Sequence, residues 1–112
     1  MEQIDRLTEE LLQAILDSSI YREYAEQEEK LSSDPELLVR VNRFRADNFL
    51  MQQENPADLY TVSEIMEQRS SELRKVPEAN AYLEAELAVN KMMQRICGTL
   101  FAGISYSVPD DV

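Results

Sequence analysis

The chain has 112 residues, and its 22 acidic against 11 basic side chains give a formal net charge of −11. This length suits one domain with its own hydrophobic core, but the sequence shows no basic stripe that could neutralise nucleic-acid phosphates. We therefore expect no direct contact with nucleic acid or with an anionic membrane surface, and a preference for basic protein partners.

The residue types that enzymes use most often for catalysis are scarce. There is no histidine and one cysteine, so neither a Cys–His nor a Ser–His nucleophile pair can form. The Glu-x-x-His ligands of ferritin-like metal sites are missing for the same reason, and neither of the two glycines belongs to a phosphate-binding loop. We therefore predict a protein that is not an enzyme and that holds no cofactor.

The N-terminal residues do not follow the pattern of a signal peptide, and no uncharged run of about 18 apolar residues occurs. We therefore expect a cytoplasmic protein. Two glycines and four prolines are few for 112 residues, which favours a small number of long helices over many short strands.

Apolar residues recur every three or four positions from residue 4 to residue 16, which predicts a first helix. Asp17, Ser18 and Ser19 interrupt this pattern, and either serine can cap a new helix by accepting a hydrogen bond from its first free amides. The pattern continues in phase beyond the serines, so one bent helix and two helices meeting at a tight break are both possible. The segment 20–31 carries tyrosines and many charges, which predicts a half-buried helix.

Asp34, Pro35 and Glu36 predict the start of the next helix, because aspartate caps, proline fits the first turn, and glutamate complements the positive helix end. This helix extends to about residue 53, and an Asn-Pro turn at residues 55–56 follows it. Apolar spacings of three and four then alternate from residue 59 to residue 76. A coiled coil and a helical hairpin in a globular bundle both give this pattern, and the short run favours the hairpin.

The last helix is predicted from Pro77 to Ile104, over roughly 40 Å at 1.5 Å per residue. It offers the longest apolar surface in the chain, so the other segments are expected to pack against it. We predict an all-α fold over residues 1–104, a single domain built as an oligomeric bundle of four to five helices with hairpin packing and a long C-terminal helix. Residues 105–112 show no periodicity and are expected to form a mobile tail.

The second half of the last helix is apolar on more than one side. One small domain cannot cover so wide a face, and such faces usually mark an oligomer interface or a groove for a partner. Homo-oligomerisation is the favoured interpretation. The predicted association surface consists of Met92, Met93, Ile96, Leu100, Phe101 and Ile104.

Two residues of the last helix have more than one interpretation. Glu86 falls within the apolar sector, where a buried carboxylate needs a partner, and Arg45 and Arg69 are the candidates. A structural ion pair that sets the helix register is favoured over a polar contact in a subunit interface. Cys97 is interpreted as a small buried hydrophobe, and the alternative is a thiolate ligand in a metal centre shared between chains.

Three stretches carry a family resemblance. The first contains the serine break and Tyr21-x-x-Tyr24, and the second is Leu31-Ser32-Ser33-Asp34-Pro35-Glu36, followed by a helix with Phe44 and Gln52-Gln53. The third is Val76-Pro77-Glu78, which leads through Tyr82-Leu83-x-Ala85-Glu86 into the apolar helix. In this order and spacing, roughly residues 3 to 104 resemble the YlbF/YmcA family of bacterial regulators.

The resemblance implies an all-α protein that self-associates or pairs with relatives and that regulates competence, sporulation or biofilm formation in Gram-positive bacteria. Some members of the family are non-catalytic subunits of a complex that influences RNA processing by RNase Y, and these can share iron–sulfur clusters through cysteines. Because Cys97 is the only cysteine of this chain, the expectation of no cofactor is kept.

We therefore expect a non-enzymatic regulatory or scaffold protein that acts through contacts between its helical faces and other proteins. The partners are its own copies, related helical proteins, or a regulatory or RNA-processing protein. The alternative is a purely structural helical homo-oligomer with no regulatory partner. A metal-dependent helical-bundle enzyme is disfavoured because histidine is absent.

Overall fold

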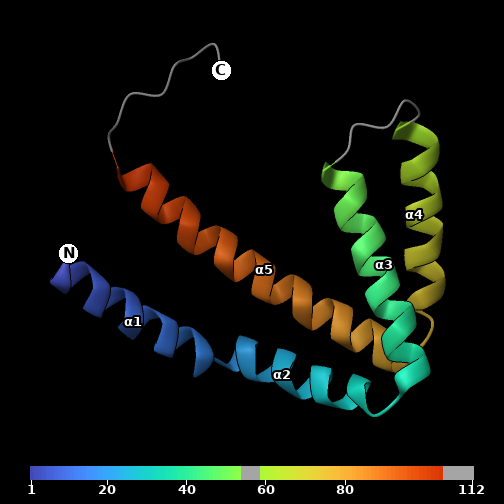
Figure 1. Ribbon diagram of the computed structural model, residues 1–112, viewed down its shortest axis with the longest axis horizontal. Coiled ribbons are helices and arrows are strands. Elements are labelled where there is room, and N and C mark those ends of the chain that lie inside the picture. Colours follow the sequence, from blue (N-terminus) through green and yellow to red (C-terminus); the bar gives the residue numbers. More distant parts are fainter. Residues whose placement is uncertain (54–58, 105–112) are drawn as a thin grey trace.

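The computed structural model describes residues 1–53 and 59–104 of the chain. This part is all-α, with α1 (Glu2–Leu16), α2 (Ser19–Ser32), α3 (Pro35–Gln53), α4 (Leu59–Leu73) and α5 (Pro77–Gly103) (Figure 1). The predicted all-α class and the long C-terminal helix are confirmed. The predicted turn at residues 55–56 and the predicted tail at residues 105–112 lie outside the described residues.

The serine break separates two helices, which decides between the two interpretations of the first apolar pattern. Ser18 adopts an extended backbone conformation (φ −69°, ψ 151°), and its Oγ accepts a hydrogen bond of 3.2 Å from the amide of Tyr21. The same hydroxyl donates a 2.6 Å bond to the carbonyl of Ile15 at the end of α1. One side chain therefore ends one helix and starts the next.

The starts of α3 and α5 follow from their prolines. Asp34 caps α3 by accepting a 3.2 Å hydrogen bond from the amide of Leu37, and Pro35 occupies the first helical position. Pro77 starts α5 in the same way, after an extended Val76. Proline lacks an N–H that would be unsatisfied there, and its φ already suits a helix.

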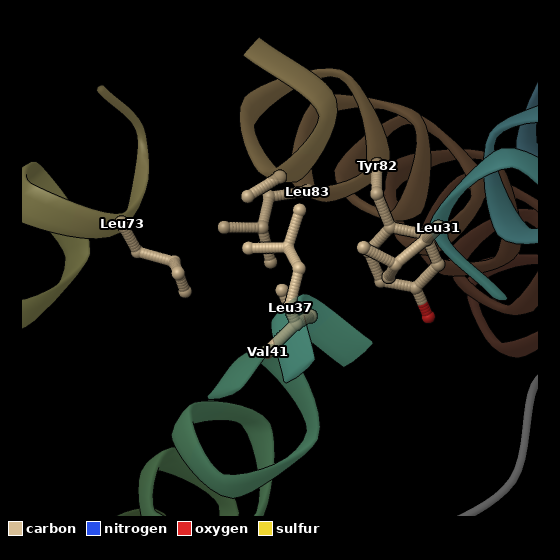
Figure 2. Packing of buried hydrophobic residues seen from close by; sticks show 7 residues of the cluster. Leu31, Leu37, Val41, Leu73, Tyr82 and Leu83 are labelled. Carbon is tan, nitrogen blue, oxygen red and sulfur yellow. The ribbon is translucent and has the colours of Figure 1, made fainter. Parts of the chain in front are cut away.

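The core lies where the end of α2, the start of α3, the end of α4 and the start of α5 meet. Leu31 and Val41 are 1% and 0% exposed, and Tyr82 projects beside Leu31 (Figure 2). Burying each such side chain contributes about 1.5–3 kcal/mol to the free energy of unfolding. The cluster of buried side chains comprises Leu31, Leu37, Val41, Leu73, Ala79, Tyr82 and Leu83.

Two arms extend from this core. α2 packs along the first half of α5, while α3 and α4 form a hairpin that rises from the start of α5 (Figure 1). The molecule measures 45 × 39 × 16 Å, and its thinnest dimension is little more than the 10–12 Å diameter of one helix. Its radius of gyration is 17.8 Å, against about 13 Å for a compact domain of this length. The chain is therefore much more open than a compact bundle.

The expectation that every segment packs against the last helix is wrong for α1. This helix has a strong apolar face but contains no buried residue. It continues the line of α2 beyond the serine break, and its free end lies apart from the end of α5 (Figure 1). The helical pattern of the sequence identifies an apolar face but does not say which element covers it.

Candidate functional site

The second half of α5 carries the surface predicted for association. Every buried residue of this helix lies between Ala79 and Ala85, so the later turns extend beyond the core. Leu100, Phe101 and Ile104 are 56%, 65% and 56% exposed, whereas Met92 and Ile96 are half buried and Met93 is 39% exposed. The six residues thus form a strip that becomes more exposed toward the end of the helix.

The apolar face of α1 is a second uncovered surface, and the sequence reasoning did not single it out. It presents Ile4, Leu7, Leu11, Leu12 and Leu16, which are between 37% and 58% exposed. The signal for it was available, because a regular apolar stripe against an acidic opposite face marks an amphipathic helix that needs a partner. We call this face and the strip on α5 the association surface.

Glu86 forms an ion pair with Arg45 of α3, the first of its two candidate partners. The Arg45 side chain is 40% exposed and that of Glu86 22%, so the pair lies at the edge of the core. The Glu86 side chain is thus only partly buried, which corrects the expectation of a buried carboxylate. Solvent access at this edge weakens such a pair.

Arg69, the second candidate, does not reach Glu86. Its Nη1 lies 2.9 Å from an oxygen of Asp47 on α3, and its guanidinium lies 5.8 Å from the centre of the Phe44 ring. The ion pair with Asp47 therefore links α4 to α3. The apolar spacing of α4 places Arg69 on the side of the helix that faces its neighbours. It does not tell whether the partner is Asp47 on α3 or Glu86 on α5.

A tyrosine pair joins α2 to α5 beside the Arg45–Glu86 pair. The hydroxyls of Tyr24 and Tyr82 lie 3.3 Å apart, and that of Tyr82 lies 3.4 Å from Glu86. Arg45 sits 5.6 Å from the centre of the Tyr82 ring, within the range of a cation–π contact. Burial raises the pKa of the Tyr82 phenol above its ordinary value, and the hydrogen bond with Tyr24 acts in the same direction. This network fixes three helices relative to one another.

Cys97 is exposed, contrary to the expectation of a buried small hydrophobe. It lies on the part of α5 that extends beyond the core. The sequence pattern identifies its neighbours on the same helix, but not a second helix that would bury it. Within residues 1–53 and 59–104, no group of three or more potential ligands is placed to hold a metal ion.

α3, α4 and α5 border an open groove of about 750 Å³. Its size is within the range of small-molecule sites, which are mostly apolar, but its lining mixes apolar and polar side chains. It extends the strip on α5 through Met93 toward the hairpin. The groove is lined among others by Phe44, Met66, Leu83, Leu87, Met93, Asn48 and Arg74.

Comparison with known proteins identifies the family. A family model described as "Control of competence regulator ComK, YlbF/YmcA" matches residues 4–105. The chain therefore belongs to the YlbF/YmcA family, and the predicted resemblance is confirmed. No curated protein and no solved structure gives a significant match. None of the described helices is both long enough and apolar enough to span a membrane.

Proposed function

We propose that this member of the YlbF/YmcA family is a non-enzymatic scaffold that controls competence by binding other protein chains through its exposed helix faces. The family description supports a regulatory role in competence. The association surface on α1 and on the second half of α5 supports the part of the proposal that concerns binding to other protein chains. Apolar faces of this extent on a small protein usually bind another protein.

The chemistry of these faces favours a helical partner. Both are single helix faces with apolar residues at helical spacing, and an amphipathic helix of a partner can cover such a face at spacings of three and four. The net charge of −11 favours basic proteins over nucleic acid as binding partners. A regulatory or RNA-processing protein, or a related helical protein, meets these requirements.

The experiment is complementation in the native host after deletion of the gene. The wild-type chain and Ala102→Glu are expected to restore the transformation frequency, whereas Phe101→Glu is expected to restore less than about a tenth of it. Ala102 is exposed on the same turn and, at about 100° per residue, lies on the side of α5 opposite the middle of the strip, so it is a matched control for the added charge.

In a second experiment, a tagged copy of the chain is used to capture binding proteins from the same host. The wild-type chain is expected to recover a regulatory or RNA-processing protein, and Phe101→Glu is expected to lose it. Normal transformation frequency in the deletion strain, or full activity of Phe101→Glu, would contradict the proposal. Recovery of the chain alone would support the purely structural oligomer instead.

A further inference from the structure

The α3–α4 hairpin carries a second kind of surface, on the side of the hairpin away from α5. The two helices lie side by side and run in opposite directions (Figure 1). The 2.9 Å ion pair between Asp47 of α3 and Arg69 of α4 sets their register. Leu50 follows Asp47 by three positions, and Ile65 precedes Arg69 by four. Because such spacings keep side chains on one face of a helix, both apolar residues share a side with the ion pair.

A small basic hollow lies on the same side of the hairpin, one turn nearer the core. It has a volume of about 170 Å³, and only residues of α3 and α4 line it. Three of the lining side chains are positive and one is negative, and Asp47 adds a second negative charge through its pair with Arg69. The local net charge is therefore +1. We call the hollow and the two apolar residues beyond it the hairpin seam, which consists of Arg40, Arg43, Leu50, Ile65, Arg69 and Glu72.

The side chains of the hairpin seam are available to another molecule. Arg40 and Arg43 are exposed, and neither forms an ion pair with a carboxylate among the side chains that the structure describes. Leu50 and Ile65 are 52% and 51% exposed. The seam thus presents two guanidinium groups at one end and two half-exposed apolar side chains at the other.

The charge of the hairpin seam differs from that of the rest of the chain. α3 carries three arginines against Glu36 and Asp47, a net charge of +1, whereas acidic residues outnumber basic ones in each of the other four described helices. Charges farther away than a Debye length of about 8–10 Å are largely screened. The local charge, rather than the total of −11, therefore decides which groups bind at the seam.

We propose that the hairpin seam binds an acidic amphipathic helix of another protein, with carboxylates in the basic hollow and apolar side chains on Leu50 and Ile65. Arg43 and Leu50 are seven positions apart on α3, a distance of about 10 Å and two helical turns. A partner helix with carboxylates and apolar residues seven positions apart on one face contacts both ends of the seam at once. Arginine suits the basic end, because a guanidinium can bind a carboxylate through two parallel hydrogen bonds.

A protein fits the hairpin seam better than a nucleic acid does. Binding to a phosphate backbone needs many cations in a row, whereas the seam combines three arginines with two nearby carboxylates and two aliphatic side chains. The inference goes beyond the proposed function, because the seam lies on the hairpin rather than on α1 or the second half of α5. Its partner is acidic, whereas the net charge of the whole chain favours basic proteins.

The first test uses a defined probe, an alanine-based helical peptide with two leucines and two glutamates seven positions apart on one face. Its binding to the isotope-labelled full chain is followed by NMR. The amide signals of the hairpin seam are expected to shift, whereas those of α1 are expected to stay in place. A matched peptide with glutamine in place of glutamate is expected to bind about tenfold more weakly, because it forms no ion pairs with the arginines.

The second test measures binding of the same acidic peptide to variants of the chain. Arg43→Glu is expected to weaken binding about tenfold and Leu50→Ser about fivefold. Arg22→Glu is the control for charge, because Arg22 is exposed on α2. Phe49→Ser is the control for lost apolar surface, because Phe49 is exposed on the side of α3 that faces α5. Both controls are expected to bind like the wild type, and all four variants to keep the helical circular dichroism.

Four results would overturn the inference. The first two are no binding of the acidic peptide and equal binding of the glutamine peptide. The third is a single-stranded RNA that binds the seam as tightly as the acidic peptide, which would assign the seam to nucleic acid. The fourth is a lower mass of Arg43→Glu in light scattering, which would show that a second copy of the chain occupies the seam.

Phe101→Glu separates this inference from the proposed function. The variant is expected to fail in complementation but to bind the acidic peptide like the wild type, because Phe101 lies on the second half of α5. Loss of peptide binding in this variant would place the peptide on the association surface and refute the inference alone. Full complementation by this variant would refute the proposed function and leave the hairpin seam standing.

Discussion

Val41 and Val39 lie two positions apart on α3, and truncating each to alanine tests whether the core lies where the four helices meet. Val41 is 0% exposed and Val39 is 58% exposed. Val41→Ala removes two buried methyl groups, which costs about 1.6 kcal/mol in transfer free energy, and the cavity that remains adds about 1 kcal/mol. The higher helix propensity of alanine offsets about 0.5 kcal/mol of this loss in the free energy of unfolding. The expected net loss is therefore about 2 kcal/mol in the free energy of unfolding.

Val39→Ala is the matched control, because it makes the same chemical change on the same helix. It removes no buried surface, so the gain in helix propensity leaves the free energy of unfolding equal or up to about 0.5 kcal/mol higher. Urea unfolding followed by circular dichroism measures both variants at one protein concentration. With a slope of about 1.5 kcal/mol per M, Val41→Ala should lower the midpoint by more than about 1 M. Equal shifts for the two variants would refute the assignment of the core.

Three further changes test the helix break and the polar network. Ser18→Ala should lower the free energy of unfolding by about 1 kcal/mol, because the cap of α2 is lost. Ser19→Ala, next to it, should change the free energy of unfolding by less than about 0.5 kcal/mol, and urea unfolding measures both variants. A double-mutant cycle with Arg45→Gln and Glu86→Gln should give a coupling free energy of no more than about 1 kcal/mol, since both side chains are partly exposed. The oligomer mass should stay unchanged in all the variants. A changed mass would place the pair in an interface. Tyr82 has a raised pKa in the folded state, so above pH ~10 the unfolded chain loses the phenol proton first and stability falls as the pH rises. The urea midpoint of the wild type should therefore fall between pH 9 and pH 11 by more than that of Tyr82→Phe. Equal falls in the two midpoints would contradict this origin.

The helix boundaries were largely predictable because they depend on local chemistry. Asp34 and Pro35 specify the start of α3 by hydrogen bonding and backbone geometry within a few residues. Pro77 specifies the start of α5 by backbone geometry alone, because Val76 makes no side-chain cap. The serine break was recognised too, but two interpretations remained. The decision between them depends on the conformation of Ser18, which bonds to both helices at once.

The errors concern which helix lies beside which. Glu86 and Arg69 were both assigned to the apolar sectors of their helices, but only the crossing of α3 with α4 and α5 brings Asp47 to Arg69 and Arg45 to Glu86. Cys97 was expected to be buried because its neighbours along the helix are apolar. Periodicity reports which residues share a face, whereas burial depends on a second element, and no helix in the described part of the chain covers that turn of α5.

The separation between the core and the association surface has a consequence for how the protein works. The buried residues gather where α2, α3, α4 and α5 meet, whereas α1 and the second half of α5, toward the far ends of the long arm, carry many of the exposed apolar residues. Changes such as Leu11→Glu are therefore expected to alter binding while the core stays intact, and changes such as Val41→Ala are expected to weaken the fold while the exposed faces keep their chemistry. If association depended on the same contacts as folding, the two groups of variants would lose helicity together. Their independence is what the proposed function requires, because that function places binding on the helix faces rather than in a pocket.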